Sequence, residues 1–202
     1  MPPSKNADKI YYYYSIAAHP MFFSIVMLAA LFLKPISSSA LGPLGELIAG
    51  ILFFAALPLA VVYKPLKRKE ITLNFEEQQK RGKFFLPWAT IFFAAFLLYS
   101  FFNAKTHAAL ALSFAAVMVF LFFANKKSKI SWHTTGLSSM ITALAYSYGS
   151  ALLILYAVLI PTISVARYKL KAHNLFELAV GAVAGSAITY ACFLVAGTPA
   201  TG

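Results

Sequence analysis

Acidic residues are scarce in this sequence, which has 6 Asp and Glu against 17 Lys and Arg in 202 residues. Proteins hold Mg²⁺ and Ca²⁺ with clusters of carboxylate oxygens, and no aspartate-rich motif occurs here. Cys192 is the only cysteine, which excludes a disulfide within the chain. We therefore expect a protein that works with no metal and no other cofactor.

Charged residues of both signs are also few, at 11% of the chain, whereas hydrophobic residues make up 60%. A soluble domain carries about 25% charged residues, and its core does not need so much apolar surface. The excess must face lipid. The composition therefore predicts an integral membrane protein that has no soluble domain of any size.

The net charge of +11 comes from basic residues in short loops between apolar runs. No basic stripe lies on a soluble domain, which argues against nucleic acid as a partner. The simplest interpretation is topological, because Lys and Arg hold loops on one side of a membrane. Membrane lipids are then the expected surroundings, and some of these charges can also hold an anion.

Apolar runs of the length of a membrane span recur along the chain. A helix needs about 20 apolar residues to cross a bilayer, and somewhat fewer inside a bundle. We predict an all-α bundle of about six to seven transmembrane helices, forming a single membrane domain over residues 1–202. The first run is long for a cleaved signal, so we expect it to be retained. The predicted spans are 14–33, 44–63, 84–102, 108–124, a short one from Trp132 to the turn at 146–150, 151–166 and 175–196.

Ionisable residues at membrane depth are costly and often functional, and one group of them opens the last span. His173 and Glu177 are four residues apart, so a helix puts them side by side on one face. The carboxylate can accept a hydrogen bond from one ring nitrogen and leave the other as a base or nucleophile. Arg167 can offer a planar fork of donors to a phosphate. The ordinary alternative is a helix-start glutamate beside an interfacial histidine.

A second group of polar residues opens the fifth span and consists of Ser131, His133, Thr134, Thr135 and Gly136. Hydroxyls and backbone N–H groups at the start of a helix can bind an anion. A simple N-cap would explain the serine. It would not explain the histidine.

The third group, Lys80, Arg81 and Lys83, precedes the third span and taken alone is a basic loop end. Two spans separate Arg81 from His133, and two more separate His133 from Arg167, so all three groups should emerge on one face. Two histidines, two arginines and a group of hydroxyls on one face can build a phosphoryl-transfer site that works without a metal.

The residues of the last group resemble a motif of the type 2 phosphatidic acid phosphatase superfamily, which also includes the vanadium haloperoxidases. That family motif is Ser-Arg-x5-His-x3-Asp. The chain has Arg167, His173 and Glu177 at the same spacing, with Glu in place of Asp and Ala166 in place of Ser. A span rich in Gly and Ala follows directly.

The two other family motifs are matched in part. Of Pro-Ser-Gly-His the chain keeps Ser131 and His133, and of Lys-x6-Arg-Pro it keeps Arg81. The resemblance covers about residues 75–196, which would form a phosphatase-like core. Residues 1–63 carry none of the motifs and would form two additional spans.

The resemblance implies a membrane phosphatase that hydrolyses a lipid phosphomonoester or diphosphate through a phosphohistidine, without a metal. Phosphatidic acid, phosphatidylglycerophosphate and polyprenyl diphosphates would be its possible substrates. His173 would attack phosphorus, Glu177 would orient it, and His133 would protonate the leaving oxygen and later activate water. The residues that would hold the phosphoryl oxygens are Arg81, Arg167, Ser131 and Lys80.

Two other functions remain open at this point. A catalytically weak or inactive relative could bind lipid or act in assembly. A small transporter could use His173 and Glu177 as a proton or ion relay, although inverted repeats and broken helices, which are typical of transporters, are not evident in the sequence.

The distribution of basic residues predicts how the protein is oriented. With seven spans, the N-terminus and the three polar groups share one side of the membrane. Apart from Lys34 and Lys105, all of the 17 Lys and Arg residues lie on that side. The positive-inside rule places the richer side in the cytoplasm, so we predict that the active site faces the cytoplasm.

Overall fold

Every regular element of the protein is a helix over the residues that the computed structural model describes, which are 6–33, 39–71 and 77–198. The composition explains this result. Backbone N–H and C=O groups in an apolar surrounding must bond to each other, and a helix satisfies them within one segment. The predicted all-α class is confirmed, since no strand occurs in these ranges.

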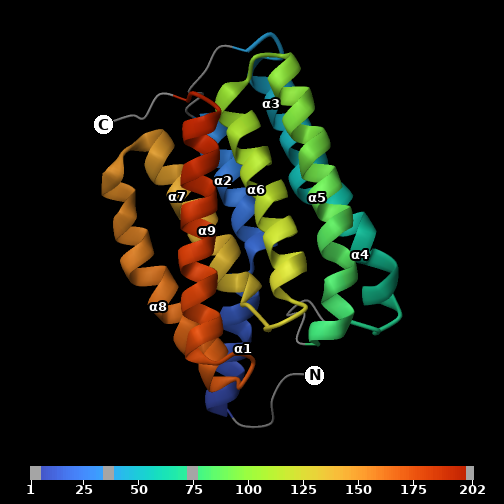
Figure 1. Ribbon diagram of the computed structural model, residues 1–202, viewed down its shortest axis with the longest axis vertical. Coiled ribbons are helices and arrows are strands. Elements are labelled where there is room, and N and C mark those ends of the chain that lie inside the picture. Colours follow the sequence, from blue (N-terminus) through green and yellow to red (C-terminus); the bar gives the residue numbers. More distant parts are fainter. Residues whose placement is uncertain (1–5, 34–38, 72–76, 199–202) are drawn as a thin grey trace.

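Five helical segments are long and apolar enough to cross a membrane, as expected of an integral membrane protein. The sequence predicts about six to seven transmembrane helices, a number that these five segments do not confirm. Helix α7 (Trp132–Tyr148) and helix α2 (Pro20–Leu33) run alongside the five but have 17 and 14 residues, which is short for a bilayer of ordinary thickness (Figure 1). The five segments are Gly42–Lys67, helix α5 (Gln78–Phe101), helix α6 (Lys105–Ala124), Ser150–Lys169 with helix α8 (Leu153–Lys169), and helix α9 (Leu175–Val195).

The prediction of one continuous helix over 14–33 is wrong, because the helix is interrupted at Ala18 and His19. Helix α1 (Asn6–Ala17) ends there, and α2 begins at Pro20. Proline is favoured at the first position of a helix but cannot continue one, since it has no N–H to donate. The break turns the amide of His19 to the carbonyl of Ile16, at 3.1 Å.

The second predicted span is a single rod that contains one widened turn. Helix α3 (Gly42–Ile51) passes through a π-helical turn (Leu52–Ala56) into helix α4 (Leu57–Lys67). Pro58 follows the turn, and a proline ring clashes with the carbonyl four residues before it, which a widened turn relieves. The carbonyl of Pro58 accepts a hydrogen bond from the indole N–H of Trp88, at 3.1 Å.

Helix α7 forms the centre of the bundle and is buried along nearly its whole length. It packs closely on α9 because Gly181 and Gly185 have no side chains. A Cβ atom at Gly181 would lie 2.9 Å from the carbonyl oxygen of Ser131, and one at Gly185 would overlap the backbone of Thr135. Small residues on α9 therefore allow this close contact, and α9 buries only one of its faces.

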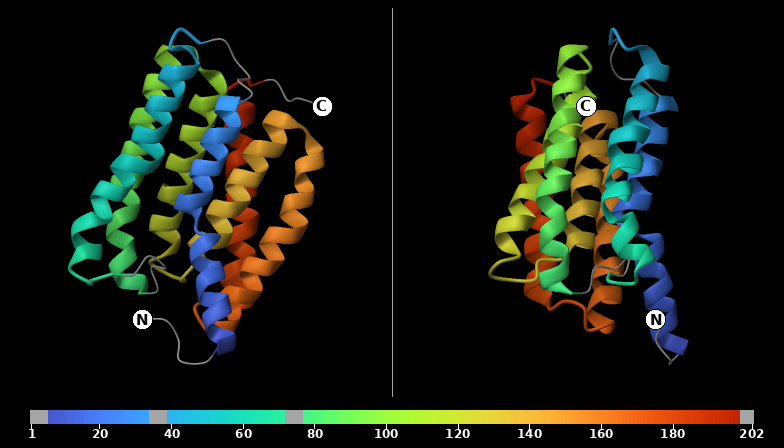
Figure 2. Two further views of the ribbon diagram at one scale, coloured as in Figure 1. Left: turned by 180° about the vertical axis from the view of Figure 1, so that it is seen from behind. Right: turned by 90° about the vertical axis from the view of Figure 1, so that its right-hand side faces the viewer.

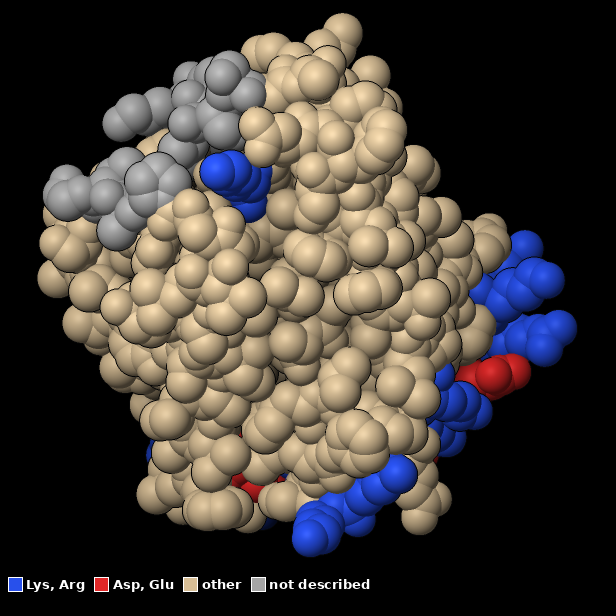
Figure 3. Space-filling view, turned by 45° about the horizontal axis from the view of Figure 1, so that its top comes forward, with Lys and Arg blue, Asp and Glu red and all other residues tan. Residues whose placement is uncertain are grey.

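The two ends of the bundle differ in charge. Helix α1 begins at the same end where α5, α7 and α9 begin and where α4, α6 and α8 finish, whereas α9 finishes at the opposite end (Figures 1 and 2). On the face seen in Figure 3, most of the Lys and Arg surface lies along the right edge and at the lower end, with a smaller basic spot toward the upper left, and a broad uncharged area covers the centre. This pattern suits a protein whose middle lies in lipid.

The contact between α7 and α9 gives a test of the fold. Gly185→Ala should lower the free energy of unfolding by about 1–3 kcal/mol, because the new Cβ overlaps backbone atoms that cannot move aside cheaply. Thermal unfolding in detergent measures the change. Gly45→Ala is the matched control, since its Cβ meets only the side chain of Leu41, at 3.3 Å. Equal melting temperatures for the two variants would contradict the close packing.

Candidate active site

The three polar groups of the sequence meet at the end of the bundle where α5, α7 and α9 begin. The loop between α6 and α7, residues 125–131, joins them. Its carbonyl at Ile130 accepts from Arg81 Nη2 at 2.9 Å, and its carbonyl at Lys129 accepts from His173 Nδ1 at 2.8 Å. The amide of Ser131 donates to the carbonyl of Glu177 at 3.2 Å.

His173 is held in one tautomer by its neighbours. A backbone carbonyl can only accept, so the bond to Lys129 requires the proton on Nδ1. The carboxylate of Glu177 accepts from the same Nδ1 at 3.1 Å, as the spacing of four residues predicts. The other ring nitrogen, Nε2, therefore carries a lone pair. This is the arrangement that a histidine nucleophile or base needs.

The start of α9 fixes the carboxylate that holds His173. Asn174 caps the helix by accepting from the amide of Glu177 at 2.9 Å, and Glu177 accepts in return from the amide of Asn174 at 3.2 Å. This capping box ties the glutamate side chain to the backbone. The ordinary interpretation of a helix-start glutamate is thus also correct, and one carboxylate serves both bonds.

Burial and two nearby cations keep the ring of His173 neutral. The residue lies in the turn between α8 and α9, outside the membrane-spanning segments. Burial, followed by the nearby guanidinium groups of Arg167 and Arg81, lowers the pKa of His173 from 6.5 to about 2. The ring therefore stays neutral near pH 7, with its single proton on Nδ1.

The two arginines are buried, and the protein meets them with few acidic groups. Arg81 donates from Nε to Asn125 Oδ1 at 2.7 Å and from Nη2 to Ile130, and among the described residues it forms no ion pair. Arg167 is fully buried and donates from Nη1 to Ser15 Oγ at 2.9 Å. Two buried cations beside Glu177 leave an excess of positive charge that suits an anion.

His133 is buried in the same region and contacts helix α1. Its Nε2 lies 3.2 Å from the carbonyl oxygen of Ser15 and 3.4 Å from the hydroxyl of Ser15. The carbonyl contact places a proton on Nε2. The ring of His19 meets the ring of His133 edge-on, with centroids 5.0 Å apart.

Ser131 is the N-cap of α7, as its alternative interpretation predicted. Its hydroxyl accepts from the amide of Thr134 at 3.4 Å, and its carbonyl accepts from the hydroxyl of Thr135 at 2.7 Å. The expected role of Ser131 in binding a phosphate stays a prediction. Ser131 lies beside Glu177 and Ile130 and so belongs to the same cluster of polar residues, which consists of Arg81, Ser131, His133, Arg167, His173 and Glu177.

Lys80 lies apart from this cluster. Its side chain is 43% exposed and pairs with Glu77 at 2.7 Å. The reason is helical: α5 begins at Gln78, earlier than the predicted span at 84, so Lys80 and Arg81 point in different directions around the helix. Arg81 faces the interior and Lys80 faces outward, so the structure does not bring Lys80 into the cluster.

Sequence reasoning missed three residues that contact the arginines or His133. Ser15 and His19 lie in the predicted first span, which carries no family motif, and His19-Pro20 was the available sign of a break. Asn125 directly follows the predicted span 108–124, and its carbonyl accepts a hydrogen bond from the side chain of Gln78 on α5, at 2.7 Å. These contacts join segments far apart in the chain, so spacing could not reveal them.

A second buried polar cluster lies at the opposite end of the bundle and was also missed. Glu46 Oε2 is 3.7 Å from Nδ1 of His107, and the hydroxyl of Ser39 donates to Glu46 Oε1 at 2.5 Å. Tyr99 donates to the carbonyl of Glu46 at 3.1 Å. In the described part of the chain, no three His, Cys, Asp or Glu residues lie close enough together to hold a metal.

Comparisons with protein-family models, with curated proteins and with solved structures gave no match for this chain. The geometry of the cluster therefore carries the functional argument.

The lowered pKa of His173 predicts how stability depends on pH. Below pH 6.5 the unfolded chain takes up a proton at this residue and the folded protein does not, so stability falls as pH falls. His173→Asn removes the titrating group. The wild type should lose up to about 1.4 kcal/mol per pH unit more than the variant between about pH 6 and pH 5. Denaturant titrations in detergent at both pH values measure this, and parallel losses would contradict the neutral, buried imidazole.

Proposed function

We propose that this protein is a membrane phosphatase that hydrolyses a phosphomonoester or diphosphate of a lipid through a phosphohistidine. The observation that carries the proposal is His173, whose Nδ1–H is fixed by Lys129 and Glu177 while Nε2 keeps its lone pair. The charges of two buried arginines, Arg81 and Arg167, act on this ring. A neutral, oriented imidazole among buried cations is suited to attack an anionic phosphorus centre. The resemblance to the type 2 phosphatidic acid phosphatases supports the same function.

The first chemical step would form a bond from His173 Nε2 to phosphorus and break the bond from phosphorus to the leaving oxygen. With the phosphate bound, whose negative charge favours a charged imidazole, His133 would carry a proton on both ring nitrogens and would give one to that oxygen. The proton on Nδ1 of His173 would stay in place, and the carboxylate of Glu177 would offset the positive charge of the phosphorylated ring.

The second step would regenerate the enzyme. His133, now neutral, would take a proton from water as the water oxygen attacks phosphorus. The bond from phosphorus to His173 Nε2 would break, releasing inorganic phosphate and restoring the lone pair. His133 would end in its starting protonated form.

Charge for the transition state would come from the arginines. Arg81 uses Nε and Nη2 for Asn125 and Ile130, and within the described residues its Nη1 group makes no hydrogen bond. Arg167 would offer a second guanidinium. Removing one such donor from a preorganised site commonly costs about 10²–10³-fold in rate. These fixed cations would do the work that a metal does in other phosphatases.

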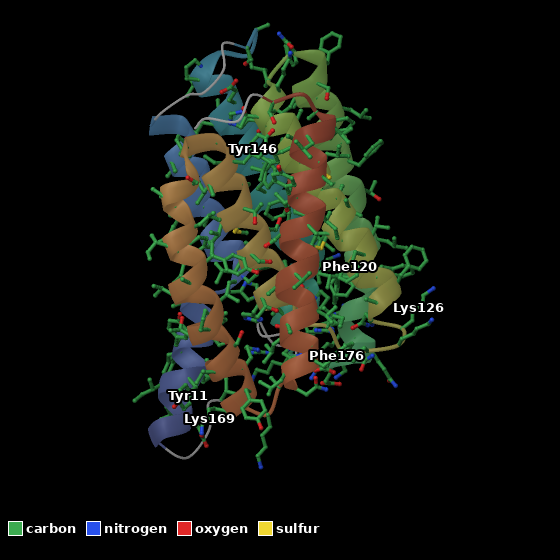
Figure 4. The ribbon with its side chains drawn as sticks, turned by 60° about the vertical axis from the view of Figure 1, so that its left-hand side comes forward. Tyr11, Phe120, Lys126, Tyr146, Lys169 and Phe176 are labelled. Atoms are coloured by element: carbon green, nitrogen blue, oxygen red, sulfur yellow. The ribbon has the colours of Figure 1, made fainter. Side chains whose placement is uncertain are left out.

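A lipid substrate fits the surroundings of the cluster. It lies at one end of a bundle with five helices suited to a membrane, where the phosphate headgroup of a lipid would be found. Figure 4 shows Lys126, Lys169 and Phe176 at this end, and all three side chains are exposed. Exposed cations and aromatic rings are common at the headgroup level of a membrane.

Phosphate release from a panel of lipid phosphates tests the function. The panel would contain phosphatidic acid, phosphatidylglycerophosphate and a polyprenyl diphosphate, in mixed micelles with purified protein. His173→Ala should reduce release by more than about 10³-fold. Glu177→Gln should be milder, because it keeps a hydrogen-bond acceptor for Nδ1 and removes only the charge. Both variants should elute as folded protein from size exclusion.

Two additions make the assay more specific. Excess chelator should leave turnover unchanged, and vanadate, which adopts five-coordinate geometry, should inhibit. Turnover that needs added Mg²⁺ would contradict the metal-independent mechanism. Wild-type protein that binds lipid vesicles but releases no phosphate would instead identify a catalytically inactive relative, and proton movement into proteoliposomes would identify a transporter.

We also propose that the chain crosses the membrane seven times, with α1–α2 and α7 as the additional passes, and that the cluster faces the cytoplasm. Basic residues support this orientation, because Lys67 and the loop at 126–129 lie at the cluster end. Lys105 is exposed at the other end, and Lys34 lies outside the described residues.

Cysteine labelling tests the orientation. Lys67→Cys and Lys105→Cys, each in a Cys192→Ser background, place one exposed thiol at either end of the bundle. An impermeant thiol reagent outside intact cells should label the cysteine at 105 and spare the one at 67. The reverse pattern would place the cluster on the outer side.

A further inference from the structure

Helix α1 reaches the proposed active site although it carries none of the motif residues. It packs against α8, whose last turn contains Arg167. The hydroxyl of Tyr14 on α1 lies 2.7 Å from the hydroxyl of Thr162 on α8. Figure 2 shows α1 beside the end of α8. Ser15, one residue further along, is fully buried.

Ser15 contacts two residues of the proposed mechanism with two different atoms. Its hydroxyl oxygen accepts from Arg167 Nη1 at 2.9 Å, and its carbonyl oxygen accepts from His133 Nε2 at 3.2 Å. Arg167 and His133 come from different helices, and Ser15 belongs to a third. One residue therefore bridges the group that would bind the phosphoryl oxygens and the group that would move the proton.

The break before Pro20 makes the second contact possible. In a continuous helix the amide of His19 would donate to the carbonyl of Ser15, four residues earlier. Here that amide turns to Ile16 instead, at 3.1 Å, and the carbonyl of Ser15 accepts from the imidazole. The same break brings the ring of His19 against the ring of His133. The local structure at 15–20 thus serves the cluster and not only the path of the chain.

We propose that Ser15 is a positioning residue of the phosphatase reaction, acting on Arg167 through its hydroxyl and on His133 through its carbonyl. The N-terminal helices then complete the site and are not an addition to it. This inference rests on the proposed function. Its physical basis is that a buried guanidinium is aligned by its acceptors, and a small misplacement of a group that meets transition-state charge is costly in rate.

Ser15→Ala isolates the hydroxyl, because it leaves the backbone carbonyl to His133. The variant should lower kcat about 10-fold and change KM less than about 2-fold, since the lost alignment affects the transition state more than binding. Ser113→Ala is the matched control. Ser113 is equally buried, and its hydroxyl donates to the carbonyl of Ala109 within α6. Ser113→Ala should leave kcat unchanged.

A double-mutant cycle separates positioning from general packing. If Ser15 acts through Arg167, then Ser15→Ala should lower kcat less than about 2-fold when Arg167→Gln is already present. Ser15→Cys is a second variant that fills the same space with a poor acceptor, and it should behave like Ser15→Ala. It keeps the test valid if the alanine variant accumulates poorly.

The outcomes distinguish this inference from the proposed function. Wild-type protein without phosphate release contradicts the proposed function, and the inference fails with it. If the wild type turns over and neither Ser15→Ala nor Ser15→Cys changes kcat, the inference is contradicted and the proposed function is not. An equal loss of kcat with and without Arg167→Gln also contradicts it, because the serine would then act by packing.

Discussion

Two guanidinium groups, Arg81 and Arg167, lie almost entirely out of solvent in a bundle whose composition suits lipid. Desolvating a cation costs several kcal/mol even after the protein relaxes. Part of that cost is offset by uncharged acceptors, the amide oxygen of Asn125, the carbonyl of Ile130 and the hydroxyl of Ser15. Glu177 is the nearby acid. The remaining positive charge makes the cluster a suitable place for an anion.

The rest of the fold holds these acceptors at the right places. Gly181 and Gly185 let α7 approach α9, which brings the loop before α7 onto Glu177 and His173. The break before Pro20 directs the carbonyl of Ser15 to His133. Packing in the bundle and chemistry at its end are therefore coupled: a change that separates α7 from α9 would also move the carbonyl that fixes the tautomer of His173.

Hydropathy and helix periodicity predicted the parts of this protein that depend on local sequence. The apolar runs predicted the long helices, and the spacing of His173 and Glu177 predicted the hydrogen bond between them. Contacts between distant segments were beyond that reasoning. Ser15 is more than a hundred residues from its partners, and Lys80 turned outward because α5 begins earlier than its apolar stretch. The exact number of membrane passes also depends on α2 and α7, which are short and lie within the bundle.

We propose that His173 Nε2 takes the phosphoryl group, and a labelling experiment tests this step. Purified protein would be mixed with a lipid phosphate carrying radiolabelled phosphorus and quenched within milliseconds in alkali. We expect label on the protein that is stable in alkali, is released by acid, and maps by mass spectrometry to the peptide containing His173. Protein that releases phosphate while this histidine stays unlabelled, or label carried by another residue, would contradict it.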